Sequence, residues 1–244
     1  MTAAATTNVI STEADLKASG TSQLVINGGK DITVSAKGTT TQATALNATT
    51  GANAEISVGA TSAAAGAVNV TSTFKGANNE VAGDIFVKGG TTVTVTQSTT
   101  NTTVNETNVQ GAVGVLGNAS TTAVTVNQDA TKAASNTGTG VVGKTAGAVT
   151  VTDKNSASTT DAGTIATVTL NNAGAATINS GALTTLNLGG TLTTVDAGTL
   201  GALTTAANST LALNLTGAVS SGTVTVDTDI KTLNISGNTT ASTL

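Results

Sequence analysis

Residues Thr91–Gln97 read TTVTVTQ, with valine at alternate positions and threonine between them. Successive side chains of a β-strand point to opposite faces, so this alternation predicts a strand with one apolar face and one hydroxyl-bearing face. The same pattern, with Val, Ile or Leu set against Thr or Asn, recurs from one end of the chain to the other. Further runs of this kind are Gln23–Asn27, Asp31–Ser35, Val68–Thr73, Thr122–Asn127, Ala148–Asp153, Ala166–Asn171, Leu211–Leu215, Thr223–Asp227 and Thr232–Ser236.

Clusters of Gly, Asn and Ser separate these runs and supply the residues that tight turns need. The short strands therefore predict an all-β fold, built as β-sandwich or β-solenoid-like subdomains with little or no helix. One stretch, Ser11–Lys17 (STEADLK), instead has the pattern of a short capped helix that ends at Gly20. After Gly163 the strand spacing shortens to about 8 to 12 residues. We place soft boundaries between β subdomains over 1–85, 86–160 and 161–244.

The composition excludes most kinds of active site. The chain of 244 residues has no His and no Cys, and its nine cationic residues are all Lys. The usual ligands of zinc, copper, haem and iron–sulfur clusters are therefore missing, as are the nucleophilic Ser-His-Asp and Cys-His arrangements. Aromatic residues make up 1% of the chain and its net charge is −4, both unfavourable for nucleic-acid binding. We expect a folded, thin-cored protein that is not an enzyme, does not bind nucleic acid and does not insert into a membrane.

The acidic residues are candidate ligands for a hard cation. Asp227 and Asp229 lie two apart in a predicted strand, so both carboxylates emerge on one face, where Ca²⁺ would relieve their repulsion. The alternative is a pair of solvated carboxylates with Lys231 nearby. Asp153 and Asp161 bracket a second polar loop, in which a lysine weakens the case for a cation.

A third oxygen-rich segment is the loop over 76–84, which contains Asn78, Glu80 and Asp84. Flexible loops with glycine, amide oxygens and carboxylates suit the high coordination number of Ca²⁺. The alternative is an ordinary turn between two strands. These three sets are the predicted calcium sites.

The two phenylalanines and the threonine rows have weaker functional interpretations. Phe74 and Phe86 are expected to fill the largest gaps in an Ala/Val core, because carbohydrate stacking favours an exposed Trp or Tyr. Outward threonines stacked in register could form a flat ice-binding face, but the rows are spaced irregularly, by about 19 to 31 residues. We therefore expect solvated faces or contacts with neighbouring subunits. The rows are Thr92/Thr94/Thr96, Thr150/Thr152, Thr167/Thr169 and Thr223/Thr225.

From about Phe86 onward the chain resembles a known family. The segments KGGTTVTVTQ (Lys88–Gln97), STTAVTVNQ (Ser120–Gln128), GAVTVTD (Gly147–Asp153) and the long string Ala162–Thr191 follow in this order. They resemble the central β-rich region of RTX-type surface-layer (S-layer) proteins of Gram-negative bacteria, of the Caulobacter type. The sequence departs from this family in lacking the GGxGxDxUx calcium-binding nonapeptide.

The resemblance implies a β-rich segment of a larger subunit that leaves the cell by type I secretion. Such subunits form a calcium-dependent two-dimensional array on the cell surface, and attach to lipopolysaccharide through a separate domain. We expect a structural, lattice-forming segment that associates with copies of itself and with other domains of its parent chain, with calcium bound outside RTX nonapeptides. The alternative is an extender or ligand-binding module of a type I secreted RTX adhesin. The start of the chain has no signal-peptide pattern, so we expect any export signal elsewhere in a longer parent protein.

Overall fold

The computed structural model of the chain contains strands, turns and irregular segments, and no helix, in the residues that it describes. These are residues 2–3, 8–16, 24–38, 45–74, 80–100, 107–130, 143–158, 160–161, 163–198, 210–220 and 222–238. The all-β prediction is confirmed. No helix long and apolar enough to cross a membrane occurs in these ranges.

Every predicted strand is present, and several more accompany them. The first half of the chain contains β1 (Thr2–Ala3), β2 (Asn8–Leu16), β3 (Leu24–Gly28), β4 (Ile32–Gly38), β5 (Ile56–Val58), β6 (Val68–Phe74), β7 (Ile85–Lys88), β8 (Thr92–Thr99), β9 (Thr107–Val109) and β10 (Val113–Leu116). The second half contains β11 (Ala123–Gln128), β12 (Gly143–Thr145), β13 (Val149–Thr152), β14 (Thr167–Asn179), β15 (Thr185–Ala197), β16 (Thr210–Ser220), β17 (Thr223–Val226) and β18 (Thr232–Asn238).

The predicted helix over Ser11–Lys17 is wrong, because β2 covers this stretch up to Leu16. The strand pairs in parallel with β4, and its register shifts between Ser11 and Asp15. A helix of about two turns is marginal on its own, whereas the neighbouring strand supplies hydrogen-bond partners on both sides of this shift. The residues that looked like a capping box lie at this irregularity in the ladder.

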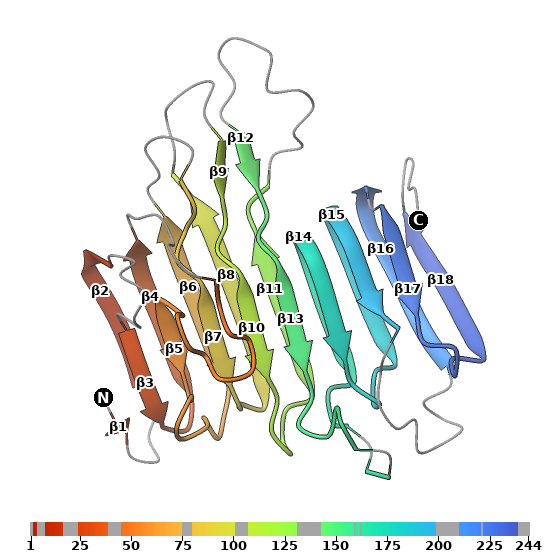
Figure 1. The fold of residues 1–244 in the computed structure, drawn as a ribbon, viewed down its shortest axis with the longest axis horizontal. Coiled ribbons are helices and arrows are strands. Elements are labelled where there is room, and N and C mark those ends of the chain that lie inside the picture. Colours follow the sequence, from red (N-terminus) through yellow and green to blue (C-terminus); the bar gives the residue numbers. More distant parts are fainter. Residues whose placement is uncertain are drawn as a thin grey trace.

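The strands form two parallel ladders wound as successive coils, an arrangement that resembles a solenoid (Figure 1). The first ladder contains β1, β3, β5, β7, β10, β13 and β17, and the second contains β2, β4, β6, β8, β11, β16 and β18. The long strands β14 and β15 contribute their first halves to the second ladder and their second halves to the first. This joins both ladders into one 16-stranded sheet, beside which β9 and β12 form a separate pair.

The core is made of apolar residues that occupy the same register position in each coil. In the second ladder this file is Ile32, Val68, Val93, Val124, Val168, Leu186, Leu213 and Ile235. In the first ladder it is Leu24, Ile56, Ile85, Val113, Val149, Ala176, Val195 and Val224. Apart from the exposed Ile235, the side chains of both files pack into one cluster, with Leu24 and Val224 partly buried against it. This cluster continues past 85/86 and 160/161, where the subdomain boundaries remain predictions.

Despite their irregular spacing, the rows at Thr92/Thr94/Thr96 and Thr167/Thr169 stack in register with each other, a question that the sequence left open. Thr94, Thr125 and Thr169 occupy one register position in consecutive coils of the second ladder. Equivalent positions are 44 residues apart between Asn127 and Asn171 but 18 apart between Thr169 and Asn187. The connections between strands take up these differences in length, while the ladders keep their register.

Polar side chains on the outward face of the second ladder bond from coil to coil. Asn187 Nδ2 donates to Thr169 Oγ1 at 2.9 Å, and Asn214 Nδ2 donates to Asn187 Oδ1 at 2.8 Å. Ser236 Oγ then donates to Asn214 Oδ1 at 2.7 Å. We call these four residues the outer polar ladder.

Three glycines in consecutive coils bring backbone against backbone. A Cβ atom on Gly111 would overlap the carbonyl oxygen of Gly83, and one on Gly147 would overlap the carbonyl oxygen of Gly111. This glycine column, Gly83–Gly111–Gly147, lies two residues before the apolar file of the first ladder. No larger residue fits these positions without movement of the backbone.

A loop over 45–54, which we call the strap, crosses the outward face of the first ladder (Figure 1). Asn47 organises it, since its Oδ1 accepts hydrogen bonds from the N–H groups of Thr49 and Thr50 at 3.0 and 3.1 Å. Gly51 lies against the ring of Phe86, with no space for a Cβ atom. The strap therefore buries both faces of the ladder at this point.

Candidate functional site

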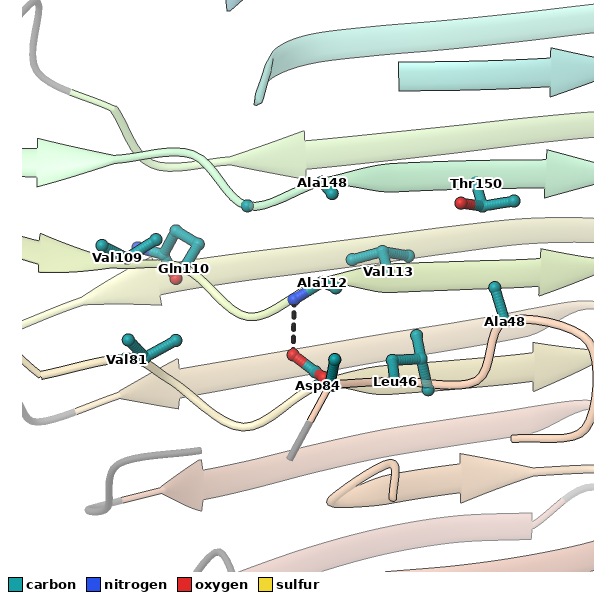
Figure 2. Close-up of a pocket in the computed structure, with 12 residues that line it drawn as sticks. Leu46, Ala48, Val81, Asp84, Val109, Gln110, Ala112, Val113, Ala148 and Thr150 are labelled. Carbon is teal, nitrogen blue, oxygen red and sulfur yellow. Dashed lines mark hydrogen bonds between the residues drawn. The ribbon is translucent and has the colours of Figure 1, made fainter. Parts of the chain in front are cut away.

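The strap and the first ladder enclose a groove of about 460 Å³ (Figure 2). Leu46 and Ala48 line it from the strap, and Val113 and Ala148 line it from the ladder. These side chains are small and apolar. The carboxylate of Asp84 is the charged group at the wall of this groove.

Asp84 is 4% exposed and precedes β7 directly. Its Oδ1 accepts a hydrogen bond from the backbone N–H of Ala112 at 2.7 Å, drawn as the dashed line in Figure 2. Burial raises the pKa of Asp84 from 3.8 to about 6, although the N–H groups of Ala112 and Leu46 favour its ionised form. Asp84 thus links the strap to the ladder through a carboxylate that is costly to ionise.

Glu55 lies beside Asp84 in the preceding coil, where its backbone N–H donates to the carbonyl oxygen of Asp84 at 2.8 Å. Its side chain is also 4% exposed, and Oε1 has no hydrogen-bond partner in the described part of the chain. Oε2 occupies the space that a Cβ atom on Gly83 would need. Burial, and next the charge of Asp84, raise the pKa of Glu55 from 4.5 to about 7.

Two buried carboxyl groups with raised pKa values can bind and release protons close to neutral pH. Ionising both requires two like charges to be held in a poorly hydrated place. Asp84 is among the residues predicted from the sequence, whereas Glu55 is not. The available signal was an acid directly before Ile56–Val58, a strand that is buried at all its positions.

The predicted pair Asp153 and Asp161 has two different environments. Asp153 is 1% exposed, and its Oδ2 accepts hydrogen bonds from Thr164 N at 2.6 Å, Ile165 N at 2.7 Å and Ser180 Oγ at 3.0 Å. Asp161 is exposed, and its Oδ2 accepts from Ser158 Oγ at 3.3 Å. Asp153 therefore organises the turn between β13 and β14.

Asp227 and Asp229 lie in the turn between β17 and β18, not within a strand as predicted. The backbone N–H of Asp229 donates to Asp227 Oδ1 at 2.8 Å, so the two residues form a local turn. Asp229 is exposed and Asp227 is half-buried.

The third predicted set, Asn78, Glu80 and Asp84, lies only partly within the described residues. Asn78 lies outside the described residues, and the backbone N–H of Glu80 donates to Asn108 Oδ1 at 2.8 Å. Within the described ranges, no group of three or more acidic, His or Cys side chains is placed to hold a metal ion. Calcium binding at the three predicted sets stays a prediction.

Phe74 and Phe86 are both fully buried, Phe74 at the end of β6 and Phe86 beneath the strap. This confirms their expected role in packing. The sequence matches no family model, and no curated protein is similar to it at a significant level.

Proposed function

We propose that the chain is a structural, non-catalytic segment of a secreted bacterial surface-layer protein, which assembles into a calcium-dependent two-dimensional array on the cell surface. The observation that carries this proposal is the stack of parallel coils with a hydroxyl- and amide-bearing outward face. Small side chains on both faces let copies approach closely, and the side-chain oxygens and amides supply hydrogen bonds across a contact.

The outward face of the second ladder is suited to packing against a neighbour. The outer polar ladder fixes its amides and hydroxyls in one arrangement, so little side-chain entropy is lost when a partner binds. This face is not a uniform threonine array, because Asn187 and Asn214 interrupt the threonine file and bond each other. A contact with protein therefore suits it better than a contact with ice.

The acidic charge of the chain supports a role for calcium in assembly. The chain carries a net charge of −4, and acidic surfaces repel one another until a divalent ion screens or bridges them. The turn between β17 and β18 contains the exposed Asp229 and the half-buried Asp227. We expect these carboxylates to take part in calcium-dependent contacts between copies.

Electron microscopy of the purified chain in millimolar calcium tests the proposal, with EDTA as the matched condition. Ordered sheets in calcium that disperse in EDTA are the expected result. Assembly that is unchanged by EDTA would remove calcium from the mechanism. Hydrolysis or cleavage of a polysaccharide by the pure chain would overturn the non-catalytic assignment.

The stacked coils also suit a second function, that of an extender module in a type I secreted adhesin, because a solenoid holds its two ends a fixed distance apart. An extender remains monomeric at high concentration in calcium, whereas a lattice segment associates. Sedimentation velocity at several concentrations separates the two.

A further inference from the structure

We propose that the outward face of the second ladder binds the same face of a second copy, so that two chains pair through an isologous contact that needs no calcium. This inference deepens the proposed function and rests on it, by naming the pair of chains from which the array is built. It is carried by a broad, uncharged surface that nothing covers among the described residues.

This surface, which we call the neutral face, extends over the second-ladder parts of β6, β8, β11, β14, β15, β16 and β18. Every outward side chain described there is Thr, Asn, Ser, Ala or Gly. Six positions run along its middle in register: Asn69, Thr94, Thr125, Thr169, Asn187 and Asn214. All six are half-buried or exposed, whereas Phe86, at an outward position of the first ladder, is covered by the strap.

The exposed acids among the described residues lie away from the neutral face. Asp196 is on the outward face of the first ladder, and Asp161 and Asp229 are in turns. The chain has a net charge of −4, so contacts between copies through surfaces that carry these acids bring like charges together. Two neutral faces meet without that repulsion and without an ion between them.

The chemistry of the neutral face makes it complementary to itself. A hydroxyl group or a carboxamide both donates and accepts hydrogen bonds, whereas a carboxylate only accepts them and an ammonium group only donates them. Bonds along the stack hold these groups in place, since Asn171 Nδ2 donates to Asn127 Oδ1 at 2.6 Å beside the outer polar ladder. Each carboxamide has a second N–H bond, so it can also donate across a contact. The same face of a second copy therefore supplies donors and acceptors in matching numbers, as an isologous contact requires.

The area of the neutral face is sufficient for a specific but weak dimer. Seven strands about 4.8 Å apart cover about 34 Å along the stack, and five residues of each strand cover about 16 Å. Two such faces bury about 1,100 Å² in total, just above the lower limit of about 1,000 Å² for a specific interface. The overlap is largest when the middle strand of the face, β14, lies over β14 of the other copy. Thr169 then lies close to its own counterpart.

An exchange of charge at Thr169 tests this contact. Thr169→Glu and Thr169→Lys each place like charges opposite one another in the pair, so each should weaken the association of the variant with itself by at least about tenfold. An equimolar mixture of the two variants places opposite charges there and should associate at least as tightly as the wild type. Sedimentation equilibrium in EDTA at low ionic strength measures these associations, and the melting temperature of each variant checks that it folds.

The matched control is Thr194, an exposed threonine on the outward face of the first ladder in the neighbouring strand β15. Thr194→Glu should associate as the wild type does. A wild type that stays monomeric in EDTA would overturn the inference, and so would equal effects of Thr194→Glu and Thr169→Glu or a mixture that associates no better than its two components. Tighter association of Thr169→Lys than of the wild type would also overturn it, because an acidic surface of the partner would then lie opposite this face.

Electron microscopy separates this inference from the proposed function. Calcium-dependent sheets formed by a chain that is monomeric in EDTA would overturn the isologous contact and leave the proposed function standing. Dimers in EDTA that form no sheets in calcium would support the contact and overturn the lattice.

Discussion

Replacing Glu55 by Gln should stabilise the protein at pH 8 and have little effect near pH 4. The pKa of Glu55 is raised from 4.5 to about 7, chiefly by burial. At about 1.4 kcal/mol for each tenfold change in proton affinity, the ionised carboxylate destabilises the fold by about 3 kcal/mol relative to the neutral acid. Glutamine has nearly the same shape and carries no charge, so the Glu55→Gln variant avoids this cost.

The direction follows from which state binds more protons. Below about pH 4.5 Glu55 is protonated in both folded and unfolded chains, so it costs nothing. Between about pH 4.5 and 7 the folded chain holds the proton and the unfolded chain has lost it, so stability falls as pH rises. Above about pH 7 both states are ionised and the full cost remains. Asp84 causes a similar decline in stability between about pH 3.8 and about pH 6, and the Glu55→Gln variant keeps this decline.

Chemical denaturation followed by far-UV circular dichroism at pH 5, 6, 7 and 8 measures this effect, since the chain has no Trp or Tyr for fluorescence. The wild type should lose about 2 to 3 kcal/mol between pH 5 and 8 through Glu55, and Glu55→Gln should lose correspondingly less. Asp229→Asn, which removes an exposed carboxylate, is the matched control and should follow the wild-type curve. Parallel pH profiles for the wild type and Glu55→Gln would refute the account of Glu55 as a buried acid.

Three further substitutions test the packing, each by thermal or urea denaturation. Asp153→Asn should destabilise the chain by about 2 to 4 kcal/mol. The variant places an amide against backbone N–H groups that otherwise donate to the carboxylate of Asp153. An unchanged denaturation midpoint would show that the turn does not need that charge. Gly111→Ala should cost about 1 to 3 kcal/mol through overlap with the neighbouring backbone, and more than Gly114→Ala, whose Cβ would lie 3.1 Å from its nearest neighbours; equal effects would argue against the glycine column. Phe86→Ala should cost about 3 to 5 kcal/mol and loosen the strap, and a smaller loss with an intact strap by hydrogen exchange would contradict its role as the anchor.

The strands that have one buried and one outward face could be predicted from the sequence, because alternation of apolar and polar residues is a direct consequence of that burial. The strands β5, β7 and β10 could not be predicted in this way, because they are buried on both faces beneath or beside the strap and show no alternation. Their short apolar runs are indistinguishable by period from other buried segments.

The winding of the chain into coils could not be predicted from the sequence either. A regular repeat length would have predicted the coils, but the step between equivalent positions varies from 18 to 44 residues. For the same reason, only part of the candidate site could be predicted from the sequence. Asp84 is predictable from its place in a polar loop, whereas its pairing with Glu55 depends on the stacking of two coils, of which the sequence gives no sign.

The glycine column has a consequence for how such a chain can change in length. At Gly83, Gly111 and Gly147 consecutive coils touch through their main chains, so the distance between coils is fixed at these three points. Residues inserted in the connections between strands can therefore loop outward without altering the stacking on either side. A gene encoding this architecture is therefore free to lengthen or shorten the connections between strands, provided that the strands keep their register.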